Sequence, residues 1–593
     1  MSKDIIIIDA KGKAQAWASY LKKAGKEGVI VPTGGQVYSF PDRLFPIGIS
    51  FDREKIDFGR VINKDKEDAI SKGIAEAGVE GRVFIATDKD VEGDAIALDI
   101  MNIIAEISSR PNNPSPGILN RTFRVHAKSL VLADISEAVE TAIPVKNNLQ
   151  RIMEAAVEGR TRAVTDRWIG AALSKKAGIP IGRVKSAVPG MALLHQARPE
   201  SLTGPVEVGE VVLTARSGAG GIPFNTRISF NSDGKDDKRD ILIGIAKKFS
   251  NRIIPGTVRP VVSLSAAVTD KWSDLKPYNT GDAVRDACRY YGVRPHQAMQ
   301  GIVRAYYRGD VSYPRTESRT LTPQSAAKIA RLGVSCDIFG LSASDAVEMD
   351  RTERVHEALH PVCESNIKNV KRLRSMVRRD WVTVFRERDQ NTEPELELMA
   401  DLMTALIARR AFEVAKSARM ERGFWRPSND HSGPSLTHDE MDVLENLDWE
   451  RETGPVFPWT RHMTTGVRIW PRESVLMDMM MKEDLGRHSS LPAMLKSVIE
   501  AGDVDVDDRS VTADTGFVLP KLTQQGRDNL KKMPKSIWDP ATGRMIARAL
   551  SNADGESNED EKDTIDLRIR KRVALWLGKL DEEVRNVMLA EMS

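Results

Sequence analysis

The N-terminal part of the chain alternates short apolar runs with helix-like stretches. Residues 5–8 form an apolar run that ends at Asp9, and a helix-like stretch follows. Residues 83–86 form a second apolar run, and apolar positions then recur at helical spacing from Glu92 onward. This alternation predicts a compact α/β domain over residues 1–135, with carboxylates at the ends of its strands.

The pattern changes in the middle of the chain. Residues 146–200 have helical periodicity, whereas strand-like segments at 206–216, 227–230 and 261–268 follow. The polar stretch 231–238 predicts a turn between two of these strands. We therefore expect a helical region followed by a β-rich one.

Helical patterns resume near residue 280, and Thr280 is a candidate N-cap. The predicted helices span about 281–291, 295–308, 395–420 and 486–500, with strand-like sequence returning at 421–470. Residues 551–563 are acidic and predict a flexible linker, and an amphipathic helix is expected from about 564 to 590.

Composition limits the possible classes of protein. A chain of 593 residues predicts three to five domains, and 41% apolar with 29% charged residues is typical of a globular protein. A net charge of +3 means that a nucleic-acid partner would have to meet local basic surfaces. No membrane-spanning run, signal peptide or phosphate-binding G-x-x-x-x-G-K-[ST] loop occurs, so we expect a cytoplasmic protein that uses no ATP and contacts no membrane.

The three cysteines are far apart and form no C-x-x-C pair. Their spacing argues against disulfide scaffolding and against tetracysteine zinc ribbons, and it fits a reducing compartment.

The segment V-S-Y-P-R-T-E-S at 311–318 carries candidate chemistry. Pro314 biases Tyr313 away from helical geometry, and Arg315 offers a planar fork that matches a phosphate group. A tyrosine hydroxyl becomes a useful nucleophile when positive charge favours its phenolate form. Such a pair suits attack on a phosphodiester, although an exposed Tyr-Pro-Arg turn without any catalytic role is an ordinary alternative.

A second cluster lies in F-I-A-T-D-K-D-V-E-G-D at 84–94. Asp88, Asp90 and Glu92 fall on the predicted turn that leaves a strand and opens a helix. Three carboxylates spaced by two residues can converge on one hard divalent cation, typically Mg²⁺. The alternative is an acidic turn that only caps the helix N-terminus.

Asp9 and Lys13 are the third element of this chemistry. A strand-end carboxylate followed by a lysine on the next turn recurs at phosphate-handling sites, where the carboxyl ends of parallel strands meet. Because many α/β proteins begin in this way, these residues indicate a site only in combination with the others.

Together these segments resemble the type IA DNA topoisomerases, in the family's order over roughly residues 5–490. The matching segments are Asp9 with Lys13, D-K-D-V-E at 88–92, R-T-R-A-V-T-D-R-W-I-G at 160–170, I-G-R-V-K-S at 181–186, P-Y-N-T at 277–280, Y-P-R-T-E-S at 313–318, H-E-A-L-H-P at 356–361 and L-G-R-H-S-S at 485–490. The sequence departs from the family pattern at Asp9 (usually Glu), Gln36 (often His), Val91 (Arg), Ala163 (Arg), Lys185 (Gln) and Glu317 (Asp).

The resemblance implies a multidomain toroid that combines an N-terminal α/β Toprim domain, mainly helical domains and a β-rich arch. The implied domains are the Toprim metal-binding domain at 1–135, the first part of a helical DNA-binding domain at 136–205, the first part of the hinge arch at 206–275, the helical domain with the nucleophilic tyrosine at 276–400, the second part of the arch at 401–470, the second part of the DNA-binding domain at 471–550, and the acidic linker and C-terminal helix at 551–593.

The resemblance also implies an ATP-independent enzyme, active as a monomer, that relaxes negatively supercoiled DNA through a 5′-phosphotyrosyl intermediate. The catalytic residues would be Tyr313, Arg315, Asp9, Lys13 and His356, and Mg²⁺ would bind Asp88, Asp90 and Glu92. Single-stranded DNA would contact Arg162, Arg183, Lys185, Ser186 and Arg487. Asp9 is the candidate general acid, and we expect crowding by the other carboxylates to raise its pKa.

Two alternatives remain open. A Toprim nuclease or primase would share the carboxylate turn but would leave the tyrosine motif unexplained. An inactive, topoisomerase-derived protein that only binds single-stranded DNA would fit the substitutions at Asp9, Gln36 and Val91.

Overall fold

The structure is a computed structural model of the chain. It describes residues 3–41, 49–52, 55–58, 60–110, 115–197, 203–218, 221–233, 238–260, 276–335, 356–362, 392–415, 419–427, 434–453, 464–506, 519–560 and 563–590. The strand predicted at 261–268 and the middle of the turn at 231–238 lie outside these residues. Within the described ranges, no helix combines the length and the apolar composition needed to cross a lipid bilayer.

The N-terminal domain is built on a five-stranded sheet with the order β2-β1-β7-β8-β9. Its strands are β1 (Asp4–Ile8), β2 (Gly28–Pro32), β7 (Val83–Ile85), β8 (Thr122–Arg124) and β9 (Ile143–Pro144). Strand β1 lies between β2 and β7 and runs parallel to both, which places the ends of β1 and β7 at one edge of the sheet. The isoleucines of β1 are fully buried on both faces, as expected for a strand between two helical layers.

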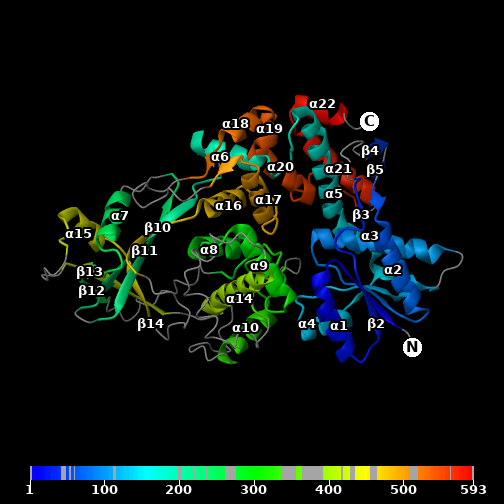
Figure 1. Ribbon diagram of the computed structural model, residues 1–593, viewed down its shortest axis with the longest axis horizontal. Coiled ribbons are helices and arrows are strands. Elements are labelled where there is room, and N and C mark those ends of the chain that lie inside the picture. Colours follow the sequence, from blue (N-terminus) through cyan, green and yellow to red (C-terminus); the bar gives the residue numbers. More distant parts are fainter. Residues whose placement is uncertain are drawn as a thin grey trace.

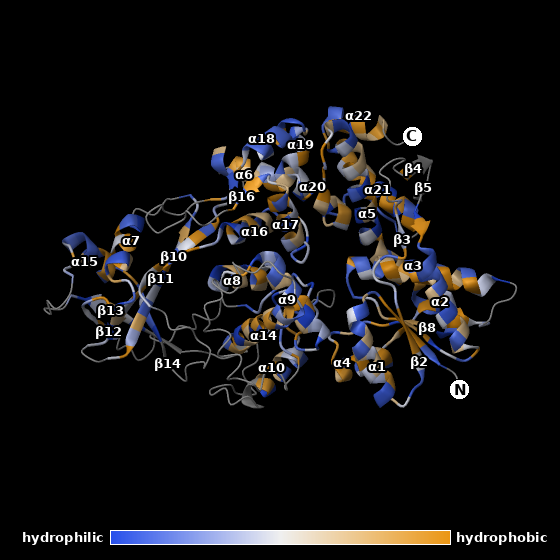
Figure 2. Cartoon of the chain, in the orientation of Figure 1, coloured by the Kyte–Doolittle hydropathy of each residue, from blue (hydrophilic) through white to orange (hydrophobic). Residues whose placement is uncertain are grey.

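Helices cover both faces of this sheet. One core contains α1 (Ala14–Lys23) and α4 (Leu132–Glu140), and the other contains α2 (Lys64–Ala77) and α3 (Val91–Ser109). In Figure 2 the strands show as an orange centre among helices that alternate between blue and orange. The predicted α/β organisation of this region is confirmed.

The middle of the molecule is helical. A long helix, α5 (Val145–Ala177), leaves the N-terminal domain and is followed by α6 (Ala187–Ala197). Around α6 lie segments from the later part of the chain, α16 (Arg472–Lys482), α17 (Leu491–Glu500), α18 (Gln524–Lys531), α19 (Lys535–Trp538) and α20 (Pro540–Ser551). Figure 1 shows these helices bridging the two ends of the molecule, with the N-terminal domain at one end.

The other end is the arch, a six-stranded sheet with the order β11-β14-β13-β12-β10-β15. Its strands are β10 (Glu207–Arg216), β11 (Pro223–Asn231), β12 (Thr257–Pro260), β13 (Arg419–Arg426), β14 (Trp449–Thr453) and β15 (Gly466–Ile469). Two helices pack on it, α7 (Arg239–Lys248) and α15 (His438–Glu445). The arch is thus assembled from two segments of the chain, with the tyrosine region inserted between them.

The tyrosine region contains α8 (Thr280–Tyr291), α9 (Pro295–Tyr307), α10 (Pro323–Ser335) and α14 (Glu393–Ala415). Helix α14 packs on α9 and therefore belongs to the tyrosine region along its length. The domain boundary expected at residue 400 falls inside this helix. The N-cap of α8 is Asn279, whose side chain accepts a hydrogen bond from the Asp282 amide, and not the expected Thr280.

The C-terminal segment is packed more closely than its acidic composition predicts. Two helices, α21 (Ile565–Gly578) and α22 (Glu582–Ala590), lie on α5, where Trp576 meets Trp168 edge to face at 6.0 Å between ring centroids. The Trp168 indole donates a 2.8 Å hydrogen bond to the Met588 carbonyl. The acidic residues are also paired, since Glu559 contacts Arg572 at 2.6 Å, so the described part of 551–563 is no free linker.

Candidate active site

The structure brings together three segments that are far apart in the sequence. Tyr313 lies in the segment after α9, and its hydroxyl donates a 2.5 Å hydrogen bond to the carboxylate of Asp90, 223 residues away in the sequence. The Arg315 guanidinium lies 3.1 Å from Glu92 and 3.7 Å from Asp90. The tyrosine motif therefore faces the carboxylate turn between β7 and α3.

Lys13 joins the same cluster from the short helix after β1. Its buried ammonium lies 2.5 Å from the Asp9 carboxylate and also contacts Asp88. Asp9 and Asp88 meet here because β1 and β7 are parallel neighbours that end at the same edge of the sheet.

The protonation of this cluster differs from the expectation based on sequence. Burial would raise the pKa of Asp9, but the charge of Lys13 and hydrogen bonds with Asp88 and Lys13 outweigh it and lower that pKa. Burial, with the charges of Asp9 and Asp90, raises the pKa of Asp88 to about 7. The expected elevation at Asp9 is thus wrong. The carboxyl that holds a proton near neutral pH is Asp88, because its burial outweighs the charge of Lys13 and because its hydrogen bond with Asp9 favours the charge on Asp9.

Tyr313 is almost fully enclosed, with 6% of its surface exposed. Its ring packs edge to face on Tyr306 at 5.8 Å and lies 4.6 Å from the His356 ring. Burial and the charges of Asp88 and Asp90 raise the pKa of the hydroxyl well above its usual value, and Arg315 only partly opposes them. The expected lowering by positive charge is therefore absent from this arrangement, in which the hydroxyl is a neutral donor to Asp90.

The P-Y-N-T segment at 277–280 holds the loop that carries Tyr313 and Arg315, which we call the nucleophile loop. The Thr280 hydroxyl donates to the Pro314 carbonyl at 2.7 Å and accepts from the Thr316 amide at 2.9 Å. The Thr280 amide in turn donates to the Thr316 carbonyl at 2.9 Å. The backbone on both sides of Arg315 is thereby fixed to the first turn of α8, a role that the sequence motif alone did not reveal.

The carboxylate turn is held by two features of its own. The Asp90 side chain accepts a 2.7 Å hydrogen bond from the Gly93 amide and so caps α3. A Cβ on Gly93 would lie 2.1 Å from the Asp88 carbonyl, so only glycine fits this approach.

Arg124, at the end of β8, lies beneath the same turn and is only 1% exposed. Its guanidinium donates to the Asp88 carbonyl at 2.8 Å and to the Asp94 carboxylate at 3.0 Å. Arg124 is not among the site residues predicted from the sequence, because one arginine in a short strand carries no motif.

The donor set of the turn suits Mg²⁺, because carboxylate oxygens are the ligands that this ion prefers, often only one or two together with water. At present Asp88 contacts Lys13, Asp90 contacts Tyr313, and Glu92 contacts Arg315. In the part of the chain that the structure describes, no three histidine, cysteine or acidic side chains already surround one point. Metal binding would therefore require the carboxylates to leave these partners.

The residues expected to contact DNA fall into two groups. Arg487 lies 2.6 Å from Glu158 and 3.3 Å from Glu317, and Arg162 contacts Glu158 at 2.9 Å, so both lie beside the tyrosine motif. By contrast, Arg183 and Ser186 are buried, and Lys185 is half-buried. Arg183 pairs with Asp166 at 2.9 Å, and the Ser186 hydroxyl accepts from the Gly182 amide at 3.2 Å.

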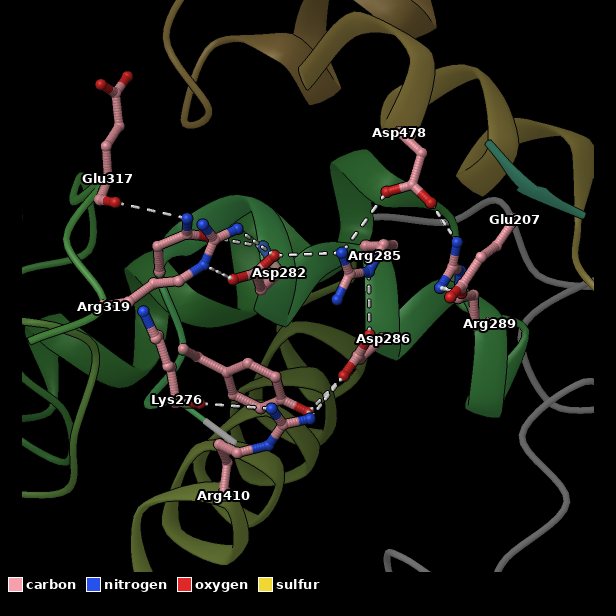
Figure 3. A network of polar contacts seen from close by, with 12 residues as sticks. Glu207, Lys276, Asp282, Arg285, Asp286, Arg289, Glu317, Arg319, Arg410 and Asp478 are labelled. Atoms are coloured by element: carbon pink, nitrogen blue, oxygen red, sulfur yellow. Dashed lines mark hydrogen bonds and ion pairs between the residues drawn. The ribbon is translucent and has the colours of Figure 1, made fainter. Parts of the chain in front are cut away.

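A network of charged side chains runs along α8 and ties the tyrosine region to its neighbours (Figure 3). Asp286 at its centre binds Arg285 at 3.1 Å and Arg410 of α14 at 3.0 Å. Farther along α8, Arg289 contacts Asp478 of α16 and lies 2.9 Å from Glu207 of the arch. One helix thus connects the site to both supporting domains.

Comparison of the fold identifies the class of protein. The structure resembles that of full-length topoisomerase I from Thermotoga maritima with a TM-score of 0.57 at 16% sequence identity, over 98% of this chain and 90% of that one. This likeness establishes the type IA topoisomerase fold.

Sequence comparison then identifies the family. The DNA topoisomerase family model matches residues 151–535, and the Toprim domain model matches residues 4–119. Because the first match alone covers more than half of the chain, the chain belongs to the type IA DNA topoisomerase family.

Two curated relatives align over shorter regions. DNA topoisomerase 1 of Campylobacter jejuni is 30% identical over 193 residues, which is 32% of this chain and 24% of that protein. Reverse gyrase 2 of Aquifex aeolicus is 23% identical over 275 residues, 44% of this chain and 20% of that protein. The alignments thus span about a quarter or less of these relatives.

Proposed function

We propose that the protein relaxes negatively supercoiled DNA without ATP, by cleaving one strand, passing another and rejoining the first. The observation that carries the proposal is the contact of Tyr313 and Arg315 with the carboxylate turn. This contact supports the proposal because it would bring a nucleophile, a phosphate-binding cation and candidate metal ligands into one cluster.

In the proposed cleavage step, the Tyr313 oxygen attacks a backbone phosphorus and forms a phosphotyrosyl ester with the 5′ side of the break. The hydroxyl proton passes to the Asp90 carboxylate, its present hydrogen-bond acceptor. The 3′ oxygen leaves and takes a proton from the cluster of Asp9, Lys13 and Asp88. The new ester conserves the energy of the broken bond, so rejoining needs no ATP.

Cationic side chains stabilise the charge on the phosphate during this step. Arg315 and Lys13 would contact the non-bridging oxygens, and one such preorganised donor typically contributes about 3 kcal/mol. His356 packs against the Tyr313 ring, and burial lowers its pKa, so it serves this site as a neutral donor or packing partner.

Asp88, Asp90 and Glu92 would hold Mg²⁺. When bound, the ion supplies positive charge that aligns the 3′ hydroxyl with the phosphotyrosine for rejoining. Arg162 and Arg487 would bind the strand beside the site through its phosphates, which predicts salt-sensitive and sequence-tolerant binding. The proposal also includes single-stranded DNA as the partner, a monomer as the active form, the lack of an ATP requirement and a cytoplasmic location. The support for these four points comes from the amino-acid sequence.

The test is relaxation of negatively supercoiled plasmid with Mg²⁺ and without ATP. We expect stepwise relaxation by the wild type, none with EDTA and none by Tyr313→Phe, whereas Tyr307→Phe, which alters a neighbouring tyrosine, stays active. A covalent protein–DNA adduct should accompany activity and depend on Tyr313. Nicked products without an adduct would favour the nuclease alternative, and DNA binding without cleavage would favour the inactive binder.

A further inference from the structure

The two faces of the arch sheet differ in character. Helices α7 and α15 pack on one face, where Leu213, Trp425 and Trp449 are fully buried with them. Along β13, the buried residues 423 and 425 alternate with the exposed residues 422, 424 and 426. Because successive residues of a strand point to opposite faces, these exposed residues belong to the face that α7 and α15 leave uncovered.

Strand register places five residues together on this uncovered face. Arg259 of β12 is directly opposite Phe424, and Thr257 is opposite Arg426. Thr257 is also opposite Arg216 of β10. We call the set of Arg216, Arg259, Arg422, Phe424 and Arg426 the arginine–phenylalanine face.

These side chains are open to solvent. Phe424 is 56% exposed, and Arg259 is its partner on the neighbouring strand. Arg422 lies 3.8 Å from Glu450, and Arg426 lies 3.0 Å from Glu445. Within the described ranges, the side chains of Arg216 and Arg259 have no hydrogen-bond or ion-pair partner. The face therefore carries four arginines against two carboxylates.

Farther along β10, the same face of the arch sheet meets the tyrosine region. Glu210 lies six residues before Arg216 on β10, on the same side of the strand, and pairs with Arg468 of β15 at 2.6 Å. Glu210 also acts on Tyr290 of α8, whose pKa burial and nearby carboxylates raise to about 12. The arginine–phenylalanine face is thus on the side of the arch that α8 occupies.

We propose that the arginine–phenylalanine face binds single-stranded nucleic acid, at a site separate from the one that contains Tyr313. Phe424 stacks on a base, and the arginines bind the flanking phosphates. Arg422 and Arg426 lie about 6.7 Å to either side of Phe424, twice the rise of a strand. One stacked base therefore has a guanidinium on both its 5′ and its 3′ side.

Several physical properties favour a single strand over a duplex. Stacking on an exposed aromatic ring needs a base whose face is free, and bases within a duplex already stack on each other. A ring flanked by arginines on an open sheet face combines stacking with charge, which is how proteins bind single strands without sequence preference. The choice of DNA as the natural strand rests on the proposed function, in which the face would hold a strand away from the cleavage site.

The test uses photochemical cross-linking of the full-length protein. A short single-stranded oligonucleotide carrying 5-iododeoxyuridine is irradiated with Tyr313→Phe protein, and adducts are located by mass spectrometry. We expect an adduct at Phe424 in addition to adducts near the cleavage site. Phe424→Ala removes the ring that reacts and should abolish this adduct. Phe424→Tyr should retain the adduct, and Phe424→Leu should lose it.

A matched charge variant tests the arginines. Arg259→Gln should lower the adduct at Phe424, whereas Arg252→Gln, on the exposed turn after α7, should leave it unchanged. Equal losses in both variants, or equal adduct yield from a duplex probe, would overturn the inference. If the wild type relaxes plasmid but no adduct forms on residues 422–426, only this inference fails. If the adduct forms but no relaxation occurs, only the proposed function fails.

Discussion

The buried carboxylate of Asp286 offers the most direct test of how the tyrosine region is held together. It is 4% exposed and accepts hydrogen bonds from the Tyr278 hydroxyl at 2.7 Å, from Arg410 at 3.0 Å and from Arg285 at 3.1 Å (Figure 3). Tyr278 is the second residue of the P-Y-N-T segment that anchors the nucleophile loop. The variant Asp286→Asn removes the charge and leaves the shape of the side chain almost unchanged.

The expected cost follows from burial. Removing one partner of a buried ion pair leaves the other charge uncompensated, which typically costs about 3–5 kcal/mol. Glu207→Gln is the matched control, because Glu207 pairs with Arg289 of the same network but its side chain is 43% exposed. An exposed pair of this kind contributes about 0–1 kcal/mol.

The pH dependence of the effect has a defined sign. Burial would raise the pKa of Asp286, but Arg285 and Arg410, with the Tyr278 hydroxyl, lower it overall. A carboxylate whose pKa is lower in the folded state stabilises the protein above its unfolded pKa of about 3.9, and this contribution is lost as the pH falls through the folded pKa. The difference between wild type and Asp286→Asn should therefore be full at pH 7 and shrink below about pH 4.

Hydrogen exchange measures this local stability without requiring that the whole multidomain chain unfold in one step. In Asp286→Asn, amide protection in α8 and α14 should fall by about two orders of magnitude or more at pH 7, since each 1.36 kcal/mol is a factor of ten. Protection in the N-terminal sheet should be unchanged. If Asp286→Asn loses no more protection than Glu207→Gln, burial does not set the strength of this contact and the reasoning is wrong.

Four further variants test the active site and the C-terminal segment. Asp9→Ala should slow strand cleavage severely in a single-turnover cleavage assay, and an unaffected rate would remove Asp9 from the mechanism. Asp88→Ala combined with Asp90→Ala should still form covalent complexes, more slowly because Asp90 no longer accepts the Tyr313 proton, but should lose plasmid relaxation, so full relaxation would contradict the metal assignment. Gly93→Ala forces the carboxylate turn to shift, because the new Cβ would lie 2.1 Å from the Asp88 carbonyl, and it should weaken Mn²⁺ binding measured by calorimetry. Trp576→Ala should lower local stability at α5 by about 3–5 kcal/mol in hydrogen exchange, and a normal protection pattern there would mean that the tail is not part of this core.

The sequence predicted the parts of this structure that depend on local patterns. The four buried isoleucines of β1 and the apolar run of β7 identified two central strands. The rule that parallel strands end at one edge then placed Asp9 near Asp88. Helices α8 and α9 agree with predicted ranges because each carries its own periodicity.

Other features depend on contacts between distant segments and could not be read from the sequence. The order of the pKa values of Asp9 and Asp88 depends on how deeply each carboxyl is buried and on the hydrogen bond between them, which are matters of side-chain placement. The arginine–phenylalanine face arises from the register of β12 with β13, two strands in separate segments of the chain. The acidic stretch before α21 looked like a linker, because its partners on neighbouring helices carry no motif.

The pairing of charges at the active site is consistent with a site that is restrained until both DNA and a metal ion bind. Each cation suited to a phosphate is now neutralised by a carboxylate suited to a metal ion, since Lys13 contacts Asp88 and Arg315 contacts Glu92. Under the proposed function, DNA would compete for the cations while Mg²⁺ competes for the carboxylates, so each would lower the cost of binding the other. This reciprocity predicts that single-stranded DNA tightens Mn²⁺ binding and that Mn²⁺ tightens DNA binding by the same factor. Calorimetric titration of Tyr313→Phe protein with each ligand, in the presence and absence of the other, measures that factor. A factor of one would mean that the present ion pairs do not restrain the site.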